Sequence, residues 1–92
     1  MDDTIKRGTL KNGFEFAVDV EILDDMELID TIAEADEGNP AKFKEATDKI
    51  LGKEQKKSLY DHLRNEKGKV PIEAFKDAFM EILESIGDEG KN

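Results

Sequence analysis

Residues 71–87 read PIEAFKDAFMEILESIG and carry the most regular apolar pattern of this chain. The apolar positions of this pattern are Ile72, Phe75, Phe79, Ile82, Leu83 and Ile86. Side chains spaced by three, four and seven residues lie on one face of a helix. The pattern therefore predicts an amphipathic helix that begins near Pro71 and ends at Gly87, because Gly is common where helices end.

Two shorter helices are predicted directly before this one. Asn39 can cap the first of them, and Pro40 follows at the first helical position, where its missing N–H costs nothing. Gly52 marks the end of that helix, and the next helix spans residues 54–64. A turn at residues 65–68 then leads to the amphipathic helix.

A further helix is predicted to begin at Asp24 or Asp25, whose carboxylates complement the positive end of a helix. It ends in the polar residues 36–39. Two adjoining apolar stripes run along it, with Met26, Ile29 and Ala33 in one and Leu28, Ile32 and Ala35 in the other.

The first part of the chain predicts a β-hairpin. Asn12-Gly13 is a preferred pair for a two-residue type I′ turn, because both residues tolerate positive φ. This pair separates residues 9–11 from residues 14–20, in which apolar side chains alternate with others. A two-stranded hairpin is weak alone, so we expect its aromatic face to pack on the helices.

Together these patterns predict one α+β domain that is mostly helical, with a β-hairpin at residues 9–20 and about four short helices at residues 24–87. A chain of 92 residues suits a single domain with a modest core. Residues 1–8 are expected to form a flexible N-terminus, and residues 88–92 are expected to fray.

Composition excludes several kinds of partner. Charged residues make up 40% of the chain and the net charge is −9. We therefore expect no nucleic-acid partner, because phosphates are bound by a basic face. We also expect no membrane partner, since no apolar run approaches the roughly 20 residues that cross a bilayer. Residues 1–4 are acidic at two positions and lack the apolar stretch of a signal peptide, so the expected location is the cytoplasm.

No catalytic, metal or cofactor site is predicted. His62 is the only histidine and the chain has no cysteine, which leaves no zinc site and no catalytic dyad. The segment around Gly68 resembles a calcium-binding EF-hand loop. Its register, however, places Leu63 and Ala74 where that loop needs carboxylates. We therefore expect a protein that is not an enzyme.

The candidate partner-binding residues lie on the last two predicted helices. Lys53, Lys56 and Lys57 form a local basic patch that could contact an acidic partner, although such runs are commonly only solvated. The apolar candidates are Leu59, Tyr60, Leu63, Phe75, Phe79, Ile82 and Ile86. Most of the apolar positions are expected in the core, and the remainder to form a groove for a partner helix or a self-association surface.

Three blocks of the chain resemble the small tail assembly chaperones of siphophages and prophages of Gram-positive bacteria. One is TLKNGFEF at residues 9–16, and another is LDDMELID at residues 23–30. The strongest is GKEQKKSLYDHLR at residues 52–64, which GKVPIEA follows at residues 68–74. The likeness covers most of the chain, from about Thr9 to Phe79, and is one of overall pattern.

The resemblance implies a non-enzymatic protein that binds and solubilises the tape measure protein, a long, apolar and helical client. The client stays bound until the tail tube protein polymerises around it. The chaperone would then act in the cytoplasm of the host bacterium and leave before the virion matures. In many such phages, ribosomal frameshifting also makes a longer form of the chaperone, a further partner that the resemblance implies.

Two other classes remain open. A small structural or connector component of a phage particle has the same composition but stays in the mature virion. An acidic regulatory module that mimics nucleic acid would need a contiguous negative face, whereas we expect the acidic residues to be spread among lysines.

Overall fold

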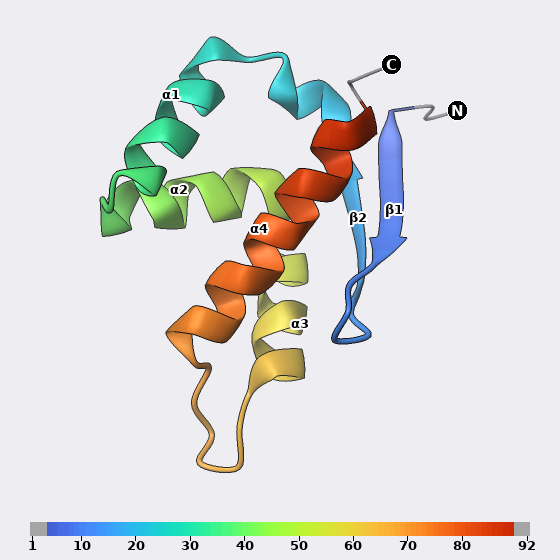
Figure 1. Ribbon diagram of the computed structural model, residues 1–92, viewed down its shortest axis with the longest axis vertical. Helices are drawn as coiled ribbons and strands as arrows, with labels where there is room; N and C mark the ends of the chain where they lie inside the picture. Colours follow the sequence, from blue (N-terminus) through green and yellow to red (C-terminus); the bar gives the residue numbers. More distant parts are fainter. Residues whose placement is uncertain (1–3, 90–92) are drawn as a thin grey trace.

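The computed structural model describes residues 4–89 of the chain (Figure 1). Two strands come first, β1 (Ile5–Thr9) and β2 (Glu15–Asp19), followed by a short 3-10 helix, η1 (Val20–Leu23). The four α-helices are α1 (Met26–Asp36), α2 (Pro40–Leu51), α3 (Lys53–Leu63) and α4 (Ile72–Glu89). The predicted class, a mostly helical α+β fold with a hairpin before four helices, is confirmed, and η1 is an addition to it.

The hairpin begins earlier than its sequence suggested. β1 and β2 pair antiparallel, with Ile5 opposite Asp19 and Thr9 opposite Glu15. Most of β1 therefore lies within residues 1–8, which we expected to be flexible. The pairing with β2 orders residues 5–8, and residues 1–3 lie outside the described part of the chain.

The turn of the hairpin is not the predicted two-residue turn. A type I′ turn needs positive φ at both Asn12 and Gly13, but only Gly13 has it, at 93°. Instead the Leu10 N–H donates to Phe14 O at 2.8 Å, and the Gly13 N–H donates to Leu10 O at 2.9 Å. The connection is thus a longer loop in which Gly alone takes the left-handed conformation.

The first two helices begin at the capping residues found in the sequence. The Asp25 side chain accepts a hydrogen bond from the Glu27 N–H at 2.9 Å, which starts α1. The Asn39 side chain accepts from the N–H groups of Ala41 and Lys42, at 3.0 and 3.2 Å, which starts α2. Both contacts satisfy N–H groups that have no partner within the helix.

The last two helices differ from their predicted bounds. α3 spans residues 53–63, one residue earlier than expected at each end. α4 continues through Gly87 to Glu89, because Gly87 is not among the glycines with the positive φ that ends a helix. Of the tail expected to fray, residues 88 and 89 therefore belong to α4, and residues 90–92 lie outside the described part of the chain.

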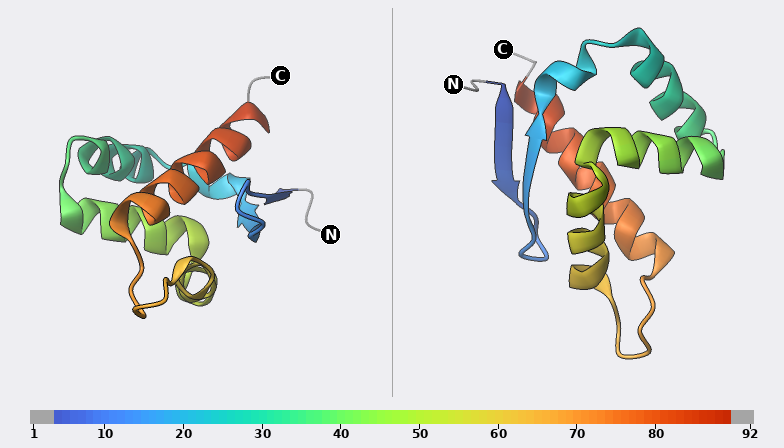
Figure 2. Two further views of the ribbon diagram at one scale, coloured as in Figure 1. Left: turned by 60° about the horizontal axis from the view of Figure 1, so that its bottom comes forward. Right: turned by 180° about the vertical axis from the view of Figure 1, so that it is seen from behind.

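α4 lies between the hairpin and the α1–α2 pair, as both Figure 1 and the left view of Figure 2 show. One hydrophobic core joins these elements. The buried apolar residues are Leu10, Phe14, Phe16, Val18, Leu28, Ala46, Ile50, Leu51, Leu59, Phe75, Ala78, Phe79, Ile82 and Ile86. The alternating strand thus turns its aromatic face inward, as predicted.

α1 contributes little to this core. Its buried residues are Leu28 and Thr31, and the helix packs against α2. Met26 and Ile29 are 68% and 42% exposed. Of the two apolar stripes found in the sequence of this helix, the one that begins at Met26 is therefore the more exposed.

Two side chains of α3 fasten the hairpin to the helices. The Gln55 amide accepts from the Ala17 N–H at 2.8 Å and donates to Ala17 O at 3.0 Å, so it satisfies the outer edge of β2. His62 Nε2 donates to Asn12 O at 2.9 Å, and its ring lies 5.6 Å from that of Phe14. The lone histidine therefore holds the hairpin loop against α3.

Candidate partner-binding groove

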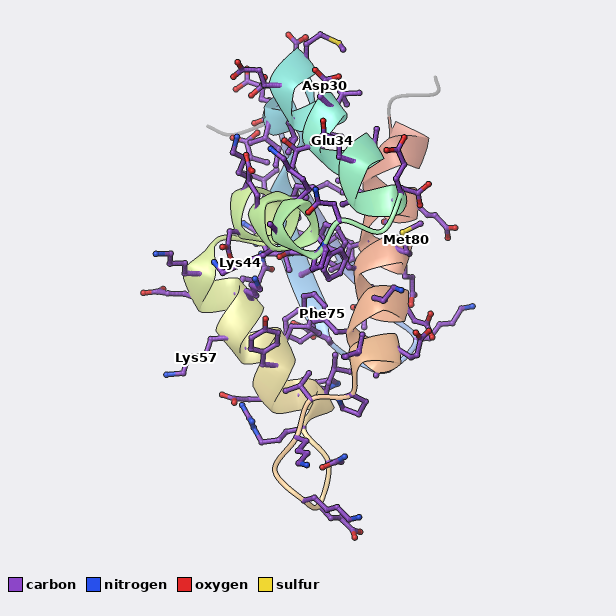
Figure 3. The ribbon with its side chains drawn as sticks, turned by 90° about the vertical axis from the view of Figure 1, so that its left-hand side faces the viewer. Asp30, Glu34, Lys44, Lys57, Phe75 and Met80 are labelled. Atoms are coloured by element: carbon purple, nitrogen blue, oxygen red, sulfur yellow. The ribbon has the colours of Figure 1, made fainter. Side chains whose placement is uncertain are left out.

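An open hollow of about 360 Å³ lies where α2, α3 and the start of α4 meet. Figure 3 looks at this side of the molecule, with Phe75 between α3 and α4. We call the hollow the aromatic groove, defined by its lining residues Phe43, Lys44, Thr47, Lys56, Tyr60, Val70, Ile72 and Phe75. The lining residues come from α2, α3, α4 and the loop before α4, so the packing of these helices fixes the shape of the groove.

Edge-to-face contacts between aromatic rings form the floor of the groove. The Phe75 ring lies 5.2 Å from that of Tyr60 and 5.8 Å from that of Phe43. Phe43 also meets Phe79 at 5.7 Å. Such pairs contribute about 0.5–1.5 kcal/mol each beyond the area they bury. Because Phe75 is buried while Phe43 and Tyr60 are half-buried, the floor is fixed and its edges remain accessible.

Ile72 stands at the edge of the groove with its side chain uncovered. It is the first residue of α4 and is 75% exposed, more than any other large hydrophobic residue within 4–89. Single exposed apolar residues are ordinary, but one that adjoins an apolar hollow enlarges a continuous apolar surface. This combination distinguishes Ile72 from Met26, which is similarly exposed but lines no such hollow.

A shared carboxylate supports the other edge of the groove. Asp48 accepts from Lys44 at 2.8 Å and from Lys56 at 2.9 Å. The Lys56 side chain is only 10% exposed, and its ammonium group lies 5.8 Å from the centre of the Tyr60 ring. Hydrogen bonds from Lys44 and then Lys56 hold the pKa of Asp48 below its usual value. Two ammonium groups thus face one carboxylate, and this edge carries net positive charge.

The apolar binding residues predicted from the sequence differ in how deeply the structure buries them. Five apolar candidates are buried, with exposures of 5% or less: Leu59, Phe75, Phe79, Ile82 and Ile86. Of these only Phe75 lines the groove, so the other four are core residues that neighbouring elements cover. Tyr60 and Leu63 are half-buried, and Tyr60 lies in the groove.

The three predicted lysines also have different surroundings. Lys56 is buried and lines the groove, where it is bound to Asp48. Lys53 and Lys57 are exposed on the outer side of α3. Figure 3 shows Lys57 extending away from the helix into solvent.

Five lining residues were absent from the prediction, namely Phe43, Lys44, Thr47, Val70 and Ile72. Phe43 and Lys44 lie on α2, for which the sequence suggested no partner. Ile72 belongs to the predicted apolar stripe of α4. Its position at the end of that stripe is the only feature of the sequence that indicates its exposure. The spacing of residues within one helix does not show which other helices it meets, so the sequence alone does not bring these groove residues together.

Acidic and basic residues are concentrated in different parts of the chain. Residues 12–41 contain ten Asp or Glu and no Lys or Arg, whereas residues 42–70 contain nine Lys or Arg and five Asp or Glu. α1 lies at one end of the longest axis, and α3 with the loop that follows lies at the other (Figure 1). The expectation that acidic residues are spread among lysines is therefore wrong for residues 12–41, and the groove belongs to the basic part.

The groove is lined by apolar and aromatic side chains together with two lysines. Within residues 4–89, no three His, Asp or Glu side chains are placed to hold a metal ion, and each buried side-chain polar atom has a hydrogen-bond partner. No helix in the same range has the length and apolar character needed to cross a membrane. What the groove presents is aromatic rings, an exposed aliphatic side chain and ammonium groups.

No protein-family model, curated protein or solved structure matches this chain. The class of the protein is therefore defined by its fold. It is a small, mostly helical α+β protein in which an antiparallel hairpin precedes four helices, with an open aromatic groove in its basic part.

Proposed function

We propose that this protein is a non-enzymatic chaperone that binds an apolar helix of a larger protein in the aromatic groove. The client suggested by the resemblance of residues 9–79 is the tape measure protein of a phage or prophage tail. In this role the chain keeps its client soluble in the bacterial cytoplasm, yields it to the tail tube protein, and is absent from the mature virion.

The observation that carries the proposal is the aromatic groove with Ile72 exposed at its edge. Amphipathic helices bind by placing side chains from one face into an apolar groove. A hollow of about 360 Å³ is near the lower end of the range for ligand sites, roughly 300–1,000 Å³. Because it is open and shallow, it suits side chains presented by another helix better than an enclosed small molecule.

The acidic part of the chain supports a second candidate, a regulatory module that binds a basic partner. Glu27, Asp30 and Glu34 are exposed on α1, within the segment that has no Lys or Arg. Lys42 of α2 offsets part of this charge, since it pairs with Glu34 at 3.7 Å. The second candidate requires contacts at α1, whereas the chaperone requires contacts at the aromatic groove.

The substitution Ile72→Glu tests the proposal. Glu at the first position of α4 suits the positive end of the helix, and the site is 75% exposed, so stability should change by less than about 0.5 kcal/mol. A charge placed over the groove should weaken client binding about tenfold or more. The assay is co-expression with the product of the longest helical open reading frame next to this gene, the expected tape measure protein, followed by measurement of the soluble, copurifying fraction.

Met26→Glu is the matched control. Met26 is likewise the first residue of its helix and is 68% exposed, but it lies on α1 away from the groove. We expect wild type and Met26→Glu to solubilise the client equally, and Ile72→Glu to fail. A client that stays insoluble with wild type refutes the chaperone function and directs attention to purified particles. Loss with Met26→Glu alone would place the client-binding surface on α1 and refute the aromatic groove as its site.

A further inference from the structure

The outer side of α3 places two exposed lysines beside the aromatic groove. Lys53, Lys57 and Tyr60 are spaced as i, i+4 and i+7, so they lie on one face of the helix. Tyr60 lines the groove, which puts the lysines along its α3 edge. Neither lysine forms an ion pair with another residue of the described chain.

The opposite side of the hollow adds a third cation. The Lys44 side chain is 72% exposed on α2, although its ammonium group pairs with Asp48. Asp48 is also bound by Lys56, so its one negative charge is divided between two ammonium groups. The apolar floor therefore has positive charge on both its α2 and α3 sides.

This local charge is opposite in sign to the charge of the whole molecule. The chain carries −9 overall, yet residues 42–70 have nine basic and five acidic residues. An acidic protein that keeps an excess of lysine around one apolar groove presents complementary charge only to an acidic partner. A basic partner would be drawn instead to residues 12–41, which contain ten acidic residues and no basic one.

We infer that the occupant of the aromatic groove is an amphipathic helix whose apolar stripe is flanked by acidic side chains. This inference rests on the proposed function and specifies the client segment. Apolar side chains of that helix cover Ile72, Tyr60 and Phe43, and carboxylates on its flanks pair with Lys53 and Lys57 on one side and Lys44 on the other. Charge at the edge of the groove then selects which helix of a long client is bound.

Two synthetic helical peptides test the inference. Each has about 20 residues, long enough to hold some helix alone, and the same leucine stripe. One carries Glu at the flanking positions, and the other carries Lys there. Binding to the full chain is measured by fluorescence anisotropy at about 50 mM NaCl, where screening is weak. We expect the acidic peptide to bind about tenfold more tightly, and the difference to shrink at about 500 mM NaCl.

Charge reversal on the protein identifies the lysines responsible. Lys53→Glu with Lys57→Glu should weaken binding of the acidic peptide about tenfold and strengthen binding of the basic one. The matched control is Arg7→Glu with Lys11→Glu, which changes the net charge equally at exposed positions of the hairpin. The control should keep the preference for the acidic peptide.

The outcomes separate this inference from the proposed function. If the chain solubilises the tape measure protein but binds both peptides equally, the charge selection is refuted and the chaperone function stands. If Lys53→Glu with Lys57→Glu leaves the preference unchanged, the inference is wrong. If neither peptide binds and the wild type forms oligomers that these substitutions dissociate, the occupant is a second copy of the chain, which also overturns it.

Discussion

At the scale of single residues, the Asp48 carboxylate links α2 to α3 at one edge of the aromatic groove. It accepts a hydrogen bond from Lys56, whose side chain is almost wholly covered, and another from Lys44, which is largely exposed. A covered ammonium group without a nearby negative charge is costly. The two lysines should therefore differ greatly in how much they depend on Asp48.

Asp48→Asn is expected to lower the free energy of unfolding by about 1–2 kcal/mol, because the buried Lys56 loses its counter-charge. Lys44→Gln, at the exposed end of the same carboxylate, should cost much less, because solvent screens the attraction of an exposed ion pair. Urea denaturation followed by circular dichroism measures both. Equal effects of the two substitutions would contradict the structural role given to Lys56.

The contribution of Asp48 should also depend on pH in a defined direction. Its pKa lies below the ordinary 3.8, so the folded state binds the proton more weakly than the unfolded state does. The stabilisation is fully present above pH 3.8 and is lost as the pH falls through the lower, folded-state pKa. The difference in unfolding free energy between wild type and Asp48→Asn should thus be constant near neutrality and shrink in acid.

At the scale of elements, two glycines should respond in opposite ways to the same substitution. A Cβ on Gly8 of β1 would lie 2.7 Å from Cζ of Phe16, whose ring is packed in the core. Gly8→Ala should therefore destabilise the protein by about 1–3 kcal/mol. A Cβ on Gly87 of α4 meets nothing within 4 Å, and Gly87→Ala should stabilise by about 0.5 kcal/mol. Thermal denaturation measures the stability of both variants. If Gly8→Ala stabilised the protein, the Phe16 ring would have to move aside to make room for the added Cβ.

The elements themselves were largely predictable, because caps and apolar spacing are local signals. Asn39 and Asp25 start helices in the structure as they do in the sequence. The hairpin turn was mistaken because Asn-Gly also fits a loop in which only Gly13 has positive φ. The register of the hairpin is set by the pairing of all five residues of β1 with β2. Apolar and polar residues do not alternate clearly in β1, so the sequence did not mark it as a strand.

The proposed binding surface was harder to predict because periodicity identifies a helix face but not what covers it. Ile72 and Phe75 belong to one apolar stripe, yet the first is 75% exposed and the second 5%. The difference comes from α2 and α3, which reach Phe75 but leave the first residue of α4 uncovered. The same holds for Met26, which lies in a stripe of α1 that the other elements within residues 4–89 leave exposed.

At the scale of the whole molecule, the core and the charge are both unevenly distributed. α4 buries Phe75, Ala78, Phe79, Ile82 and Ile86, whereas α1 buries only Leu28 and Thr31. α1 also holds four acidic residues and no basic one, in a segment with ten acidic residues. A helix with little buried surface and strong self-repulsion should open before the rest of the fold.

Native-state hydrogen exchange measured by NMR should therefore give lower opening free energies for the amides of α1 than for those of α4. Raising NaCl from about 20 to about 500 mM shortens the range over which charges interact and should relieve the repulsion within residues 12–41. Protection of α1 should then rise, while α4, which is held mainly by buried apolar contacts, changes less and serves as the internal control. Equal opening free energies and equal salt responses in the two helices would show that α1 unfolds only with the whole domain, despite its small share of the core.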